Sequence, residues 1–504
     1  MPRYSSAQFY KDWRYCVEKD FTNPDGEQVK YATDGFRTWG GELYKLPFPT
    51  APENASVNAD CSLIAIAVSD NIYVYDTVNF AEVLVLKGHI SRIDNLAFQP
   101  HNPKILVSSA QNNYGGSVPT EPTIIIWDLD KQQEHPIMED SVISSIASQA
   151  TDSIAENFLM VHTRIELSAA EEKSLTSAIE PVISQIVRTH AMSNQRTING
   201  RLSTSFQAEI FSPSGSHLIY MPGQRPRSNH VDRWDVKIYS MATHEDLLTL
   251  RGHTDALMWT GYSPDGTMIS TVAWDQSMRI WDAASGEQKF VFETTGQNWT
   301  GGFSPDSKRF AGTCGDGTFY VYSLNDGTTI LKQKAGHSWM RALDWAPDSN
   351  ILAIGEGHGA KPGRFALFDV NEKKVVQERV FSTEACRAPR EYKSFIGSSL
   401  ECQAIKFVDG GRKVLVLTSG DGGIETYDLQ TWEKWRFARP NIDPPFDDEP
   451  EDERPFDDNF NNPLIHGGYR MAVWEDHKEG SIFYASLDGD SVRIWDVPMT
   501  KTSS

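Results

Sequence analysis

Three arginines and a histidine lie close together in one polar stretch of the chain and could bind an anion. Arg225, Arg227, His230 and Arg233 fall within nine residues. The planar guanidinium group pairs with carboxylates and phosphates through two parallel hydrogen bonds. Exposed arginines are also common on solvated loops that bind nothing. The stretch therefore predicts a carboxylate or phosphate site, with a solvated loop as the alternative.

The sequence contains no motif typical of a catalytic centre. Gly355-Glu356-Gly357-His358-Gly359 is rich in glycine, but it lies between expected strands, and a phosphate site needs the free amides at the start of a helix. The thirteen histidines are spread along the chain, and the nucleophile-elbow, Walker and zinc-protease motifs do not occur in it. We therefore expect no catalytic activity, cofactor or metal, with a site assembled from distant residues as the alternative.

The charge balance restricts the class of partner. The chain has 504 residues, with 47 Lys and Arg against 68 Asp and Glu and a net charge of −21. An acidic surface repels phosphate groups, so we expect neither general nucleic-acid binding nor docking on a membrane. The longest apolar runs, such as Leu63–Val68, are far shorter than the ~20 residues that span a bilayer. Five scattered cysteines and an N-terminus without an apolar signal segment favour a cytoplasmic or nuclear protein.

Residues 439–466 form an acidic connector. Nine carboxylates and a single arginine lie between residues 443 and 458, and the unit Pro-Phe-Asp-Asp occurs twice, at Phe446 and at Phe456. High charge density together with proline predicts a disordered segment. The two phenylalanines are candidate anchors for a basic groove on a partner, and a solvated loop is the alternative.

Residues 139–200 form the largest addition to the chain, and their pattern is mainly helical. Ser168-Ala169-Ala170-Glu171 has the form of a capping box, in which serine and glutamate side chains satisfy free amides at a helix start. Apolar residues that include Ile179, Ile183 and Ile186 follow at helical spacing. This stripe either packs on the rest of the protein as a lid or docks a partner helix.

Two further details of this addition can be predicted. Pro181 interrupts the apolar stripe and should kink or split the helix. Upstream, residues 141–156 have weak helical periodicity, whereas residues 157–167 alternate as a strand does.

A short strand pattern that ends in an aromatic residue recurs along the chain and determines the expected fold. Where nothing is inserted the period is 41 or 42 residues, as between Tyr239, Trp281 and Tyr322, which is the length of a four-stranded propeller blade. About 20 residues before each mark a turn such as Ser263-Pro264-Asp265-Gly266 separates two strands. The eight marks lie at Tyr75, Trp127, Tyr239, Trp281, Tyr322, Phe368, Tyr427 and Trp495.

This repeat resembles that of the WD-repeat β-propellers. The resemblance is strongest at residues 252–293, which contain Gly252-His253 and Trp281-Asp282, and it covers most of residues 55–497. It implies an all-β propeller, with eight blades favoured and seven as the alternative, and a helical insertion between blades two and three. It also implies a buried hydrogen-bonded chain formed by His253, Thr271, Asp275 and Trp281.

The repeat also predicts how the ring closes. The last repeat offers three strands, and we expect the N-terminal residues 36–44 to supply the fourth, so that residues 36–498 form one propeller closed by both ends. Residues 1–35 would then be an N-terminal extension and residues 499–504 a tail.

Long segments are expected on one face of the ring. The loop between the second and third strands of a blade lies on the same face as the connector to the next blade. All six long segments are predicted there, which favours a binding surface over random insertion. They are residues 111–122, 139–200, 222–234, 355–363, 382–398 and 439–466.

These features favour a non-catalytic scaffold that binds one or more proteins as a monomeric ring within a larger complex. Trp339, which follows a Gly-His pair, joins the arginines, isoleucines and phenylalanines above as a candidate contact. A ubiquitin-ligase substrate receptor is the first alternative. The arginine that such receptors often carry two residues after Trp-Asp is replaced by Asp130, Ala284 and Pro498. A propeller enzyme with a central-channel site is the second alternative.

Overall fold

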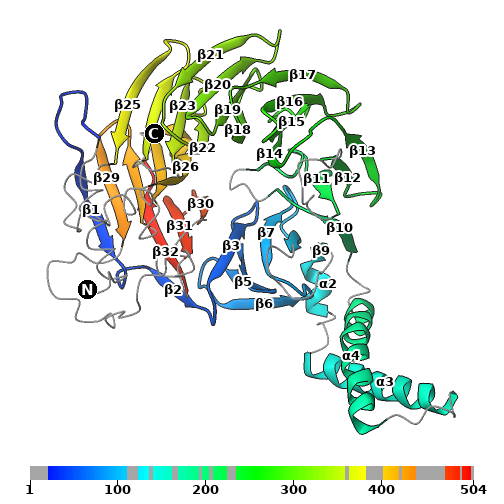
Figure 1. The fold of residues 1–504 in the computed structure, drawn as a ribbon. Coiled ribbons are helices and arrows are strands. Elements are labelled where there is room, and N and C mark those ends of the chain that lie inside the picture. The colour runs from blue at the N-terminus through cyan, green and yellow to red at the C-terminus, as the bar shows by residue number, and fades with distance from the viewer. Residues whose placement is uncertain are drawn as a thin grey trace, which may run out of the picture.

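The computed structural model consists of a ring of β-sheets from which a pair of helices projects (Figure 1). It describes residues 21–110, 123–134, 140–161, 168–191, 196–203, 208–223, 234–357, 363–381, 401–418, 423–438, 471–487 and 491–500. The described strands form seven sheets, of which one has seven strands, one has five and the others have four. The seven-stranded sheet joins the strands of two successive repeats.

Four sheets consist of four consecutive antiparallel strands each, as the repeat predicts. Strands nearest the middle of each sheet are the most buried; all six residues of β15 are buried, for example. The four sheets are β3 (Pro52–Val57), β4 (Leu63–Val68), β5 (Asn71–Asp76) and β6 (Glu82–Lys87); β14 (Leu257–Tyr262), β15 (Met268–Ala273), β16 (Ser277–Asp282) and β17 (Gln288–Glu293); β18 (Asn298–Phe303), β19 (Arg309–Cys314), β20 (Thr318–Ser323) and β21 (Thr329–Lys334); and β22 (Met340–Trp345), β23 (Ile351–Glu356), β24 (Arg364–Asp369) and β25 (Lys374–Val380).

The closing sheet combines both ends of the chain. β30 (Met471–Asp476), β31 (Ser481–Leu487) and β32 (Ser491–Pro498) are joined by β2 (Tyr44–Pro47), which pairs antiparallel with β32. The N-terminal segment therefore supplies the fourth strand, but it does so with residues 44–47 and not with the expected residues 36–44. Phe36 lies instead in β1 (Lys30–Thr38), which pairs with a different sheet.

β1 is a fifth strand on the sheet of β26 (Cys402–Val408), β27 (Lys413–Thr418), β28 (Ile424–Asp428) and β29 (Glu433–Ala438). It runs parallel to β29 and covers that edge. The short helix η1 (Asp409–Gly411) connects β26 to β27. Part of the expected extension 1–35 therefore belongs to the ring, because main-chain hydrogen bonds to β29 begin at Lys30.

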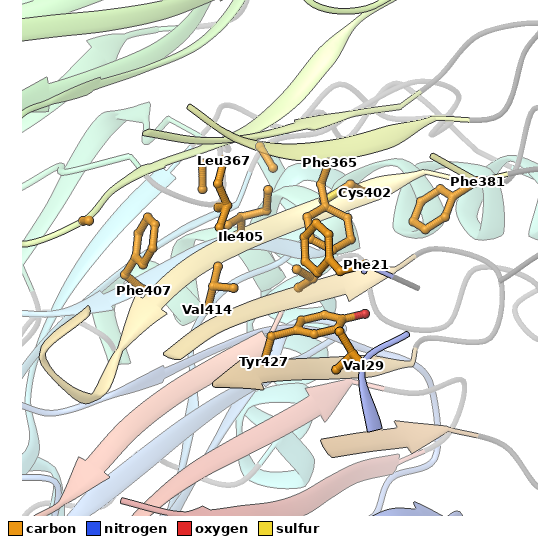
Figure 2. Close-up of a cluster of buried hydrophobic side chains, with 14 residues drawn as sticks. Phe21, Val29, Phe365, Leu367, Phe381, Cys402, Ile405, Phe407, Val414 and Tyr427 are labelled. Atoms are coloured by element: carbon orange, nitrogen blue, oxygen red, sulfur yellow. The ribbon is translucent and has the colours of Figure 1, made fainter. Parts of the chain in front are cut away.

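Phe21 anchors the segment that precedes β1. Its ring is completely buried and contacts Phe365 and Tyr427 edge to face, with centroids 4.6 and 5.0 Å apart. Figure 2 shows these residues with Val29 and Cys402 in one apolar cluster, to which strands of two neighbouring sheets contribute. Burial of a phenylalanine side chain stabilises the fold by about 1.5–3 kcal/mol, so Phe21 helps to hold β1 in place.

The seven-stranded sheet contains the helical insertion. It comprises β7 (Ile93–Phe98), β8 (Ile105–Ala110), β9 (Thr123–Asp128), β10 (Arg196–Arg201), β11 (His217–Pro222), β12 (Val236–Ser240) and β13 (Asp246–Leu250). The last two residues of β10 also pair with β11, which joins the second repeat to the third. The first strand of the third repeat is reduced to isolated bridges at Glu209 and Phe211.

The position of the insertion corrects the prediction. β10 pairs antiparallel with β9 and is the fourth strand of the second repeat, so the insertion lies within that repeat and not between blades two and three. The chain leaves the ring at Asp128, which pairs with Ile105 at the start of β8. The loop that precedes β9 joins the other end of these strands. The insertion therefore starts on the face opposite the other five long segments.

Two helices make up most of the insertion. α2 (Leu129–Glu134) follows β9, and α3 (Asp140–Val161) and α4 (Ala169–Ala191) pack against each other and extend away from the ring (Figure 1). The capping box is present, since Ser168 Oγ accepts from Glu171 N at 3.4 Å and Glu171 Oε2 accepts from Ser168 N at 2.8 Å.

Two predictions about these helices need correction. Pro181 does not split its helix, because α4 continues through it. Residues 157–161 belong to α3 and not to a strand, because the helix already established by the preceding residues extends over their short alternating pattern.

Candidate functional site

The predicted hydrogen-bonded chain forms inside the sheet of β14–β17. His253 Nδ1 lies 2.7 Å from Asp275 Oδ2, and His253 Nε2 lies 2.7 Å from Thr271 Oγ1. The indole Nε1 of Trp281 donates to the same hydroxyl oxygen at 2.9 Å. The structure thus brings all four residues together, and Asp275 further accepts hydrogen bonds from the amides of Thr254 and Ser277.

Burial and hydrogen bonds determine whether His253 and Asp275 are charged. Burial lowers the pKa of His253 more than the neighbouring carboxylate raises it, so the imidazole is neutral at pH 7. Burial acts to raise the pKa of Asp275, but the hydrogen bonds from His253 and Ser277 outweigh it and hold the pKa below its usual value. A neutral imidazole between a carboxylate and a hydroxyl is a structural arrangement that satisfies buried polar groups.

The second repeat contains a shorter version of this chain. His89 Nε2 lies 2.7 Å from Ser108 Oγ, to which Trp127 Nε1 donates at 2.8 Å. The repeat has no aspartate at the corresponding turn, and within the described residues His89 Nδ1 has no hydrogen-bond partner. Burial alone lowers the pKa of His89 to about 3.

Trp339 belongs to an aromatic cluster on the face where most long segments start. It precedes β22, while Trp274 follows β15 and Trp299 is the second residue of β18. The ring centroids of Trp339 are 5.3 Å from those of Trp299 and 6.1 Å from those of Trp274. We call these three residues the tryptophan cluster and this side of the ring the loop-rich face. Each side chain is partly exposed.

Sequence reasoning did not identify two members of the cluster. Trp274 and Trp299 lie beside expected strand ends in successive repeats, and Trp339 lies at the same end one repeat later. The signal that could have found them is their common position at one end of the strands. Trp299 and Trp339 are 40 residues apart, which is about one repeat, whereas Trp274 lies only 25 residues before Trp299.

The candidate isoleucines lie elsewhere. Ile179, Ile183 and Ile186 lie on α4, where Ile179 and Ile183 are partly buried and Ile186 is 57% exposed. The structure therefore separates them from Trp339. Arg225, Arg227, Arg233, Phe446 and Phe456 lie outside the described residues, as does the acidic connector 439–466.

Comparison with known protein families identifies one of the repeats. The family model "WD domain, G-beta repeat" matches residues 244–282, the part of the chain that holds the four hydrogen-bonded residues. The chain contains a WD repeat.

Curated relatives match parts of this WD-repeat chain. WD repeat-containing protein 1 of Gallus gallus is 26% identical over 276 residues, which are 49% of this chain and 41% of the relative. Eukaryotic translation initiation factor 3 subunit I of Pyricularia oryzae is 27% identical over 130 residues, or 24% of this chain and 36% of the relative. The chain thus spans less than half the length of these relatives.

Solved structures show the same fold. Saccharomyces cerevisiae Sqt1 has a TM-score of 0.56 and 9% identity, covering 91% of this chain and 99% of its own. Chaetomium thermophilum Sqt1, bound to the N-terminus of the ribosomal protein L10, has a TM-score of 0.53 and 12% identity over 90% of this chain and 99% of its own. The fold is a β-propeller. None of the described helices is long and apolar enough to cross a membrane.

Proposed function

We propose that this WD-repeat protein is a non-catalytic scaffold whose loop-rich face binds one or more proteins. The observation that carries the proposal is the tryptophan cluster, because three neighbouring sheets each place a partly exposed indole at the same point of that face. Tryptophan is among the residues that contribute most to protein–protein binding. Sqt1, which shares the fold, is known in complex with the N-terminus of a ribosomal protein, which supports binding of a peptide segment.

Several other features support the same function. Five of the six long segments start from strand ends on this face, and loops on one rim of a rigid scaffold commonly carry function. Curated relatives include a subunit of a translation initiation factor, which supports a cytoplasmic or nuclear location within a larger complex. The comparisons give no support to a ubiquitin-ligase receptor.

Affinity purification with mass spectrometry tests this proposal. The double variant Trp274→Ser and Trp339→Ser changes the loop-rich face, and Val78→Ser is a matched control because Val78 is 80% exposed on a turn of the opposite face. We expect the double variant to lose partners that the intact protein and the control both retain. Recovery of the same partners by all three proteins would show that the face is not the binding surface.

A further inference from the structure

The geometry of the tryptophan cluster restricts how a ligand can bind to it. Its ring centroids are 5.3–6.3 Å apart, with interplanar angles of 36°, 43° and 68°. These are the distances of aromatic rings in direct contact, so no side chain can enter between them. A ligand therefore has to lie across the outer faces of the rings.

Backbone contacts hold the cluster in place before a ligand arrives. A Cβ atom on Gly315 would lie 2.8 Å from the ring of Trp339, so the turn after β19 can approach this indole only with glycine there. The amide of Gly357 donates to the carbonyl oxygen of Trp339 at 2.8 Å, and the amide of Trp274 donates to Ala256 O at 2.9 Å. A rigid aromatic surface loses little entropy when it binds.

The protein itself already places a guanidinium group on this cluster. The Cζ atom of Arg341 lies 4.9 Å from the ring centroid of Trp299, which is a cation–π contact. Glu401 holds this arginine, with its carboxylate 3.4 Å from Arg341 Nη1. The indole of Trp299 thus already holds a cation on its face while a carboxylate neutralises the charge.

Carboxylates outnumber cations around the cluster. Burial acts to raise the pKa of Asp316, but hydrogen bonds from Thr295 and Thr318 outweigh it, so this carboxylate beside the cluster stays ionised at neutral pH. Glu356 and Glu401 are ion-paired with Arg364 and Arg341. The acidic residues at this end of β14–β26 are Asp255, Asp275, Glu293, Asp316, Glu356 and Glu401, against the basic residues Lys334, Arg341, Arg364 and Arg379.

We propose that the tryptophan cluster binds a basic segment of a protein partner, with an arginine or lysine side chain lying across the exposed indole faces. The neighbouring carboxylates, Asp316 first among them, supply the opposite charge, and the net charge of −21 attracts the segment over longer distances. This inference rests on the proposed function and names its class of partner.

Fluorescence anisotropy with defined peptides tests the inference on the full chain. The probe is a labelled peptide of alternating arginine and serine, and its counterpart has glutamate in place of arginine. We expect the arginine peptide to bind and the glutamate peptide not to bind. Trp274→Ser with Trp339→Ser should weaken binding about tenfold, in line with loss of cation–π contacts in a partly desolvated site.

A pair of charge variants separates this site from general attraction by an acidic protein. Asp316→Asn should weaken binding about threefold and reduce its salt dependence, since one nearby charge is removed. Asp326→Asn changes the net charge equally, but Asp326 lies on an exposed turn of the same sheet at the opposite face, so its binding should equal that of the intact protein.

Equal affinities for the intact protein, the tryptophan variant and both aspartate variants would overturn the inference. Should the double tryptophan variant fail to fold, Trp274→Phe retains an aromatic ring and should still weaken binding about twofold through its weaker cation–π contact. If the arginine peptide fails to bind while the tryptophan variant loses cellular partners, the basic-segment inference is wrong and the proposed function stands.

Discussion

Acidification should destabilise the ring through His89, and the size of the effect follows from the burial of that side chain. The pKa of His89 is lowered to about 3 in the folded protein, whereas an imidazole in an unfolded chain has a pKa of about 6.5. Above pH 6.5 the side chain is neutral in both states and costs nothing. Below it the unfolded chain binds a proton that the folded protein cannot, so stability falls until the pH approaches 3.

The magnitude is about 1.4 kcal/mol for each pH unit, or about 2 kcal/mol between pH 6.5 and pH 5. His89→Gln removes the titrating group while Trp127 can still donate to Ser108. This variant should be less stable than the intact protein at pH 7.5, because its side chain fits the site less well. At pH 5 its disadvantage should be smaller by about 2 kcal/mol, since only the intact protein loses stability at this site.

Urea denaturation of both proteins at pH 7.5, 6.5 and 5 measures this change. His477→Gln controls for the loss of one imidazole, because His477 has a side chain that is 76% exposed. A difference between intact protein and His89→Gln that stays constant across these pH values would refute the reasoning. It would mean that His89 exchanges protons with solvent in the folded protein.

Three further predictions concern the ring and its additions. Asp275→Ala should leave the buried partners of that carboxylate unpaired and lower the free energy of unfolding by about 1–3 kcal/mol per group. Thermal unfolding measures this loss, with Glu287→Ala on an exposed turn as the control. A change below about 0.5 kcal/mol would contradict the buried hydrogen-bonded chain. Deletion of residues 1–47 removes β1 and β2, so the exposed edges of β29 and β32 should cause aggregation or a large fall in Tm. A truncated protein that melts like the intact chain would exclude closure by the N-terminal segment. Replacement of residues 135–195 by a short Gly/Ser bridge should leave the Tm of the ring nearly unchanged, since α3 and α4 pack on each other. A large fall in Tm would instead show that the helices stabilise the core of the ring.

The repeat could be predicted from the sequence because its period and its strand alternation are local. Around Trp281 the turn, the strands and the buried histidine all fall within one unit of about 42 residues. The fourth strand of the second repeat could not be predicted in the same way. Arg196–Arg201 contains a single aliphatic residue, Ile198, and it is a strand only because β9 and β11 flank it.

The other differences have the same origin in contacts between distant residues. Residues 36–44 and residues 44–47 both carry strand patterns, and only the geometry of β32 selects the second. Trp274, Trp299 and Trp339 have no common spacing, and the curvature of the ring brings them together. Pairings between distant segments leave no local trace that a single sequence can show.

The two N-terminal strands have a consequence for synthesis of the protein. β1 and β2 pair with β29 and β32, whose residues follow them by 400 or more positions in the chain. At roughly 5–20 residues per second, the ribosome needs about 20–80 s to make that length. During this interval the intervening repeats can stack in order, but the first strands have no partner, so completion of the ring must wait until β29 and β32 have been made. A nascent-chain crosslink to a chaperone is therefore expected at the N-terminal segment rather than at the middle repeats.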